Sequence, residues 1–244
     1  DTHHVLQIEQ PIAPLRSTGD DNPYIAFRKY LAWDAFAAAL GMSDDARIAL
    51  IREADAAVQG VAGTGFRFTP FARHDALSDA LGFTAAGGAW VKDETHGVAD
   101  SHKSRHLFTE MLHLLAAEKT GTASWSTPDT RPPLAIASCG NAAFAASTLA
   151  KAMRWPIEVF VPENAAAELT DLLLSVGATI VRCPRLANDP PGDPCVHRFR
   201  EAVAQGAIPF GVQGTENAWC LDGGRTIGWE MADSMERVSG PPLD

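Results

Sequence analysis

The segment from residue 90 to residue 105 contains side chains whose types and spacing could carry out amine chemistry. It includes Trp90-Val91-Lys92-Asp93-Glu94-Thr95 and, further on, Asp100-Ser101-His102-Lys103-Ser104-Arg105. Lys103 falls in the first turn of a predicted helix, where unpaired backbone N–H groups create positive potential. That potential favours the neutral amine, which attacks carbonyl groups, and the same N–H groups could bind a phosphate. The alternative is an ordinary solvated lysine, which spacing alone favours.

A second segment, Ser138-Cys139-Gly140-Asn141-Ala142, lies between an apolar run and an alanine-rich helix. In open α/β sheets, ligands bind beyond the carboxyl ends of the strands, beside helix N-termini. Gly140 would let the backbone approach a ligand closely. Ser138 and Asn141 supply short polar side chains, and free N–H groups suit a carboxylate. The alternative is a helix cap, because both residues are good capping residues.

The elements that must position these segments form an alternating series. We predict strands over residues 134–137, 157–161, 178–181 and 208–211, and helices over 141–153, 164–176 and 196–205. Strands alternating with helices of this length indicate βαβ units and a parallel sheet with covered faces. A short strand at 89–91 and a long helix at 101–120 would carry Lys103.

The front of the chain is predicted to be helical. Asn22 can cap and Pro23 suits the first position of a helix that runs to Gly41. Ser43 can cap a second helix, which Gly60 would end. The last predicted helix covers residues 224–237.

Composition excludes several classes of protein. The chain has 244 residues, a hydrophobic fraction of 46%, a net charge of -10 and a pI near 5.2. An acidic balance argues against nucleic acid or an anionic membrane as a partner. No apolar run approaches the roughly 20 residues that span a bilayer, and the first residues do not form a signal peptide. We therefore expect a cytoplasmic protein.

Two further residue sets receive structural interpretations. The cysteines lack C-x-x-C spacing, so we expect free thiols in a reducing compartment, with a disulfide between Cys183 and Cys195 as the alternative. A possible metal-binding spacing occurs on one helix face, but without H-E-x-x-H order, so we expect no metal site. That face comprises His102, His106, Glu110 and His113.

Taken together and in this order, the lysine and asparagine segments resemble the fold-type II pyridoxal-phosphate enzymes. That family includes threonine synthase, threonine and serine ammonia-lyases, cysteine synthase and the tryptophan synthase β chain. Weaker similarity at residues 174–178 and 221–227 extends the resemblance from about residue 66 to residue 237. The resemblance implies an α/β fold of parallel twisted sheets with helices on both faces, and pyridoxal 5'-phosphate as the cofactor.

The resemblance also implies roles for particular residues. Lys103 would form the Schiff base with the cofactor, and Ser101 and His102 would approach its phosphate. Asn141 would contact the ring hydroxyl. The substrate would be surrounded by a loop of four residues, namely Ser138, Gly140, Asn141 and Ala142. One departure is Asp100, where the family usually has glycine.

The same resemblance predicts three parts and an incomplete larger domain. Residues 1–99 would form its N-terminal helices and first strand, residues 100–215 a small α/β domain, and residues 216–244 the return into the larger domain. The family's glycine-rich phosphate loop has no match in the chain. We therefore expect a truncated chain, a chain completed by another, or a degenerate paralogue.

The implied function is a lyase that removes the α-proton of an amino acid and eliminates its β-substituent, as threonine and serine ammonia-lyases do. The alternatives are β-replacement, a threonine synthase-like reaction, or a fragment without catalytic activity. The expected partner is a small amino-acid substrate, with no nucleic acid and no membrane, and a homodimer is a possible assembly.

Overall fold

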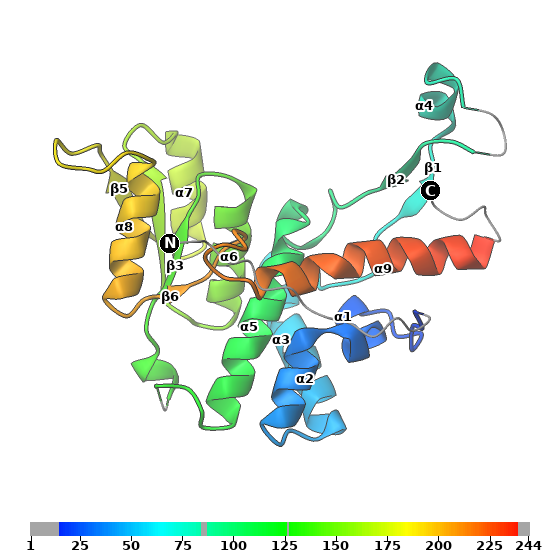
Figure 1. The fold of residues 1–244 in the computed structure, drawn as a ribbon, viewed down its shortest axis with the longest axis horizontal. Helices are drawn as coiled ribbons and strands as arrows, with labels where there is room; N and C mark the ends of the chain where they lie inside the picture. Colours follow the sequence, from blue (N-terminus) through cyan, green and yellow to red (C-terminus); the bar gives the residue numbers. More distant parts are fainter. Residues whose placement is uncertain (1–14, 84–86, 126, 239–244) are drawn as a thin grey trace.

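The computed structural model describes residues 15–83, 87–125 and 127–238. Helix α5 (Lys103–Lys119) lies at the centre and packs against helices from both sides of the molecule. A four-stranded sheet and its helices lie to one side, and the N-terminal helices and the long helix α9 (Cys220–Val238) lie to the other (Figure 1).

The main sheet has the strand order β5-β4-β3-β6, and every neighbouring pair is parallel. Its strands are β3 (Leu134–Ala137), β4 (Ile157–Pro162), β5 (Thr179–Cys183) and β6 (Ile208–Pro209). Leu134 is in register with Ile157 on one side and with Ile208 on the other. The predicted parallel sheet is therefore confirmed. Strand β6 is shorter than predicted, because the chain turns away after Phe210 donates to Ala135.

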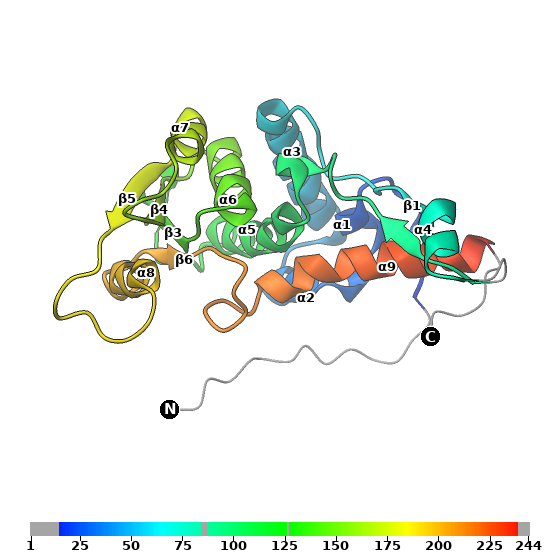
Figure 2. The same cartoon turned by 90° about the horizontal axis from the view of Figure 1, so that it is seen from above.

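Helices cover both faces of this sheet, as predicted (Figure 2). On one face, α6 (Asn141–Ala152) packs with buried Ile136 and Val159 in the main core, and α7 (Ala167–Ser175) lies beside it. On the other face, α8 (Pro194–Ala204) contributes Phe199, which contacts Phe160 edge to face. Alternate side chains of a strand point to opposite faces, so each strand serves both cores.

The predicted helix from residue 23 to residue 41 is wrong, because the chain forms three short pieces there. They are α1 (Pro23–Ala26), a 3₁₀ turn (Arg28–Tyr30) and α2 (Ala32–Ala39). Asn22 caps α1 as predicted, accepting from the backbone N–H of Tyr24 at 2.9 Å. Leu31 is extended, and the N–H of Trp33 donates to the Asp222 carboxylate of α9 at 3.2 Å. The Asp222 carboxylate, which belongs to the distant helix α9, therefore caps the beginning of α2 as a separate helix.

Helix α3 (Asp44–Ala62) begins at the predicted cap, where Ser43 accepts from the N–H of Ala46 at 3.2 Å. It continues through Gly60 and ends at Gly63, whose φ of 76° is left-handed. The predicted stop at Gly60 is therefore wrong. Gly63 ends the helix because its N–H bonds back to Gln59 in a conformation that glycine adopts without strain.

An arm projects from the helical side of the molecule (Figure 1). It consists of β1 (Phe71–Arg73), α4 (Asp75–Ala80) and β2 (Trp90–Lys92), with β1 and β2 paired antiparallel. Only the strand at β2 was predicted. The arm exposes large apolar side chains, namely those of Leu77, Leu81, Phe83 and Val91.

Two further 3₁₀ turns, Val98–Asp100 and Pro128–Thr130, flank α5 in the sequence. In the part of the chain that the structure describes, no helix combines the length and apolarity needed to cross a membrane.

Candidate active site

Lys103 is the first residue of α5 and is partly buried. Its ammonium makes no hydrogen bond or ion pair with any residue in the described ranges. Burial lowers the pKa of His102 and of His106, and the charge of Lys103 lowers both further.

The start of α5 is held by its own backbone and side chains. The buried Ser101 hydroxyl accepts from the N–H of Lys103 at 3.2 Å, and the Ser101 carbonyl accepts from the N–H of Ser104 at 3.3 Å. His102 is exposed and provides no side-chain cap. These bonds position Lys103 firmly, and they leave fewer N–H groups at this helix start for a phosphate than the sequence predicts.

The two residues before Ser101 adopt an unusual backbone conformation. Ala99 has a φ of 55° and Asp100 a φ of 51°, both in the left-handed region. Side chains with a Cβ are strained there, although aspartate tolerates it better than most. The family's preference for glycine where this chain has Asp100 thus has a conformational reason. The Asp100 side chain is exposed.

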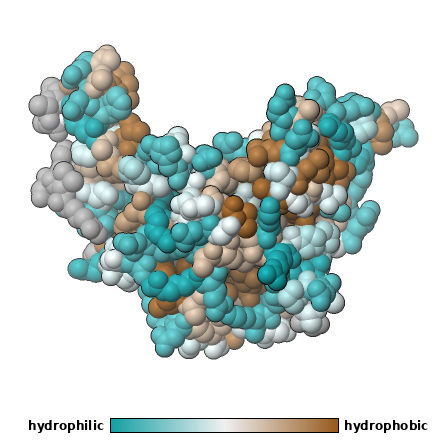
Figure 3. Space-filling model, turned by 180° about the vertical axis from the view of Figure 1, so that it is seen from behind, coloured by the Kyte–Doolittle hydropathy of each residue, from teal (hydrophilic) through white to brown (hydrophobic). Residues whose placement is uncertain are grey.

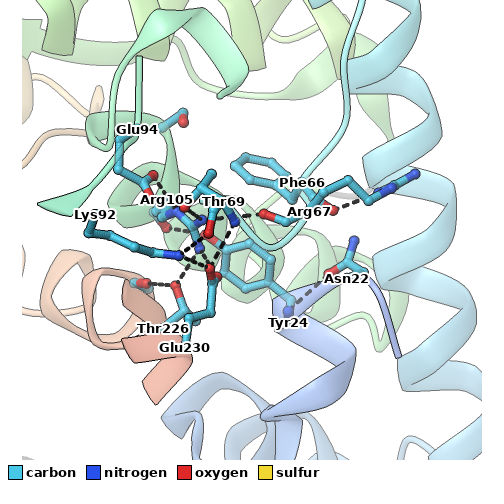
Figure 4. Close-up of polar contacts among 12 residues, drawn as sticks. Asn22, Tyr24, Phe66, Arg67, Thr69, Lys92, Glu94, Arg105, Thr226 and Glu230 are labelled. Carbon is cyan, nitrogen blue, oxygen red and sulfur yellow. Dashed lines mark hydrogen bonds and ion pairs between the residues drawn. The ribbon is translucent and has the colours of Figure 1, made fainter. Parts of the chain in front are cut away.

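Behind Lys103 lies a buried ionic network that the sequence analysis did not predict (Figure 4). The Arg105 side chain, 3% exposed, bridges Glu94 at 2.7 Å and Glu230 at 2.5 Å. The Lys92 ammonium also contacts Glu230, at 2.5 Å, so one carboxylate of α9 joins β2 to α5. Lys92, Glu94 and Arg105 all belong to the lysine segment itself, but their partner Glu230 lies more than a hundred positions away, so the sequence offered no local signal for the network.

Tyr24 closes the network from the side of α1. Its hydroxyl donates to the backbone carbonyl of Arg105 at 2.8 Å, and burial raises its pKa, which keeps it a neutral donor. Its ring packs edge to face on Phe66 and Phe108, at centroid distances of 5.1 and 4.7 Å. The first turn of α5 is therefore fixed by packing as well as by charge.

At the asparagine segment, the structure decides between the cap and the open site. Gly140 is the N-cap residue of α6, and no side chain caps this helix. Asn141 is the first helical residue and is exposed, and neither its side chain nor that of Ser138 has a partner among the described residues. The backbone N–H groups from Cys139 to Ala142 also lack acceptors within the described ranges. The capping interpretation is therefore wrong, and the start of α6 keeps backbone N–H groups that are free to bind a ligand.

The two segments lie at neighbouring positions in the fold. A cavity of about 250 Å³ is lined by Gly97, Ala99 and Asp100 and, from the first half of α6, by Phe144 and Thr148. The chain that leads into Lys103 therefore packs beside the helix that Asn141 begins. From behind, the surface has a broad concave outline between the arm and the sheet (Figure 3).

Neither a disulfide nor a metal centre accompanies these residues in the described ranges. All four cysteines are free thiols, Cys139 exposed and the others buried. Burial raises the pKa of Cys183, and its contact with Cys195 opposes this only in part. Within the same ranges, no group of three His, Cys, Asp or Glu side chains could hold a metal ion.

A parallel α/β fold thus carries the lysine segment and the asparagine segment at the starts of two helices that pack against each other. The family model described as "Pyridoxal-phosphate dependent enzyme" matches residues 63–243. The chain belongs to this family, and the assignment gives pyridoxal 5'-phosphate as the cofactor.

Three solved structures share this fold. Diaminopropionate ammonia lyase from Escherichia coli in complex with D-serine matches with a TM-score of 0.57 and 20% identity, over 80% of this chain and 51% of that one. Maize serine racemase matches at 0.52 and 18%, over 79% and 50%. Threonine deaminase isoform 2 from Solanum lycopersicum matches at 0.53 and 17%, over 79% and 47%.

The chain spans about half the length of these structures, and at these identities the likeness concerns the fold. A search of curated protein sequences found no match.

Proposed function

We propose that this chain provides the lysine and substrate-carboxylate parts of a pyridoxal-phosphate-dependent lyase that eliminates the β-substituent of a small amino acid. The residues fit the cofactor in two respects. Lys103 offers an unpaired amine, and the α6 loop offers N–H groups and side chains without partners in the described ranges. When bound, pyridoxal phosphate supplies an electron sink for charge that develops at the substrate α-carbon.

The observation that carries this proposal is that one lysine, Lys103, has no hydrogen-bond or ion-pair partner in the described ranges. The chain has five lysines, all within the described ranges, and four of them have an oxygen partner. These four are Lys29, Lys92, Lys119 and Lys151. Lys103 is the exception, although it is less exposed than most surface lysines. A desolvated, unpaired amine at a helix start is costly for stability and useful for nucleophilic and base chemistry.

In this proposal, Lys103 would hold the cofactor covalently, and its amine, once displaced from the cofactor by the substrate amine, would accept the α-proton of the substrate. The substrate carboxylate binds to a loop of four residues, namely Ser138, Gly140, Asn141 and Ala142. Asn141 also contacts the ring hydroxyl of the cofactor. Ser101 and His102 lie on the phosphate side. Because the free N–H groups gather at α6, we assign the main anion contact to the asparagine loop.

The first test is covalent labelling. The purified chain is mixed with pyridoxal phosphate, its visible spectrum is recorded, and borohydride is added before peptide mapping. We expect a yellow band and label fixed on Lys103, with neither in Lys103→Ala. Lys119→Ala, at the other end of α5, is the matched control and should label as the wild type does. Label spread over several lysines would contradict the proposal.

The second test separates the alternatives. A lyase releases ammonia and a keto acid from L-serine or L-threonine alone. A β-replacement enzyme requires a second nucleophile, and a threonine synthase-like enzyme requires a phosphorylated substrate. A chain without catalytic activity would hold the cofactor weakly or not at all and consume no amino acid. Sedimentation of the labelled protein would test the homodimer.

A further inference from the structure

A polar cavity of about 450 Å³ lies on the helical side of the molecule, between the segment before α1, helix α3 and the strand-like segment after α3. Its charged and amide walls come from residues far apart in the sequence. They include Asp20, Asp21, Asn22, Arg52, Asp55 and Arg67. None of these residues belongs to the site proposed around Lys103.

The amide of Asn22 is the unexplained group in this wall. The residue is 4% exposed, and its Oδ1 is used as the cap of α1. Its Nδ2 is buried and has no acceptor anywhere in the described ranges. In Figure 4 this nitrogen points away from the Tyr24 backbone and toward the side where Arg67 lies. A buried donor without an acceptor destabilises the folded protein, and a ligand oxygen that accepts from it would remove that cost.

The cavity offers unused groups of both charges. The Nη1 of Arg67 bonds Asp55 at 2.7 Å and the Phe66 carbonyl at 2.6 Å, which leaves its Nε and Nη2 without a partner among the described residues. Arg52 uses one nitrogen on Asp20, at 2.8 Å. The Asp21 side chain is exposed and has no donor in the described ranges. Donors for a carboxylate and an acceptor for an ammonium thus line one space.

We propose that this cavity is a second binding site and that its ligand is a free amino acid with a neutral side chain. The ligand carboxylate accepts from Asn22 and Arg67, and its ammonium faces Asp21. A dicarboxylate would meet three aspartates, and a diamine would meet two arginines and leave the Asn22 amide unmatched. Asp20 and Asp55 already pair with Arg52 and Arg67. A zwitterion, which carries both charges and no net charge, therefore fits this wall best.

The variant that isolates the Asn22 donor is Asn22→Asp. It keeps the oxygen that caps α1 and replaces the amide nitrogen with a second oxygen that repels a carboxylate. Gln205→Glu makes the same amide-to-carboxylate change on an exposed helix end outside this cavity and serves as the control. Arg67→Gln, which changes a half-exposed side chain, is the second variant should Asn22→Asp fail to fold.

The full 244-residue chain carrying Lys103→Ala, which removes the proposed catalytic amine, is titrated with L-alanine and L-valine. The side-chain amide signals of Asn22 are followed by NMR, and the variants are compared by calorimetry. We expect saturable shifts of the Asn22 signals and, in Asn22→Asp or Arg67→Gln, binding weakened by about tenfold or more. Gln205→Glu should bind like its parent. Propionate and ethylamine, each with one of the two charges, should bind more weakly than L-alanine.

Three outcomes would overturn the proposal. They are unmoved Asn22 signals at about 10 mM of either amino acid, unweakened binding in both cavity variants, and propionate binding as tightly as L-alanine. Because the background lacks the Lys103 amine, the result does not depend on whether the proposed lyase activity exists.

Discussion

At the scale of single residues, the surroundings of the lysine segment are more informative than its letters. Lys103 is unpaired within the described ranges. Arg105, two positions on, pairs with two carboxylates, and its backbone carbonyl accepts a hydrogen bond from a tyrosine hydroxyl. Before both residues, the chain approaches α5 through two left-handed residues, Ala99 and Asp100. Such strain is typical of sites where the backbone must present a side chain in one direction.

Ala99→Gly should stabilise the protein. Relief of a left-handed alanine is worth about 1–2 kcal/mol and the added freedom of glycine costs about 0.5–1 kcal/mol, so a small gain remains. The same change at exposed Ala56, inside α3, should cost about 1 kcal/mol. Urea unfolding of both variants measures the difference, and equal losses would show that Ala99 is not strained.

Arg105→Gln should destabilise the protein by about 3 kcal/mol, because it leaves Glu94 and the buried Glu230 with fewer partners. Lys119→Gln breaks the exposed pair with Glu53, whose side chains are 50% and 65% exposed, and should cost less than about 1 kcal/mol. Chemical denaturation compares the two. Similar small losses would mean that the buried network contributes little to stability.

At the scale of elements, two helix starts for which the sequence offers capping residues have opposite roles. Ser43 caps α3 with its hydroxyl, whereas α6 begins at Gly140 without any side-chain cap. The start of α6 is thus left with free donors for an anion. The close contact between α9 and α5 has a different cause. A Cβ on Gly223 would collide with the carbonyl oxygen of Arg105, so the glycine permits the approach.

Asn141→Ala should leave the free energy of unfolding within about 0.5 kcal/mol of wild type and weaken pyridoxal phosphate binding, because its side chain has no partner in the described ranges. Ser43→Ala should cost about 1 kcal/mol and leave cofactor binding unchanged. Thermal unfolding and a cofactor titration are run on both. A loss of stability in Asn141→Ala like that of Ser43→Ala would restore the capping interpretation.

At the scale of the whole molecule, burial by distant segments shifts the pKa of two side chains of α5, Glu110 and His113. Glu110 is fully buried, and its carboxyl has no hydrogen-bond partner of good geometry in the described ranges. Burial raises its pKa well above the usual value, and the nearby N–H of Gly211 opposes this only in part. Burial lowers the pKa of His113, which stacks on Trp219 at 4.1 Å, to about 4.

These two groups predict opposite pH dependences of stability. The raised pKa of Glu110 means that the unfolded chain loses its proton first, so stability falls as pH rises above about 4.5. The lowered pKa of His113 means that the unfolded chain gains a proton first, so stability falls as pH drops from about 6.5 toward about 4. Of these two groups, His113 causes no further change in the free energy of unfolding above about pH 6.5.

Glu110→Gln should therefore remove the part of the decline in stability that Glu110 causes above about pH 4.5, which amounts to at most about 1.4 kcal/mol per pH unit. Urea unfolding at several pH values measures the slope. Glu236→Gln, at an exposed position of α9, is the control and should keep the wild-type slope. An unchanged slope in Glu110→Gln would show that Glu110 is ionised in the folded protein.

Prediction from the sequence succeeded where local pattern and structure agree. The strands over 134–137 and 157–161, the helices between the strands, and the caps Asn22 and Ser43 were found from periodicity and capping residues. The lysine and asparagine motifs gave the family and the cofactor. The roles of their residues, and the division at residues 99 and 215, stay predictions.

What the sequence by itself determined is the order of the elements and the chemistry available at two of their ends, because both depend on neighbours along the chain. Tertiary structure alone decided the rest. It interrupted the first predicted helix, because Asp222 caps the start of α2. It brought together the ionic network of Lys92, Glu94, Arg105 and Glu230. It also left the Asn141 side chain without a partner in the described ranges. These features join residues more than a hundred positions apart or depend on burial, and no local spacing records either.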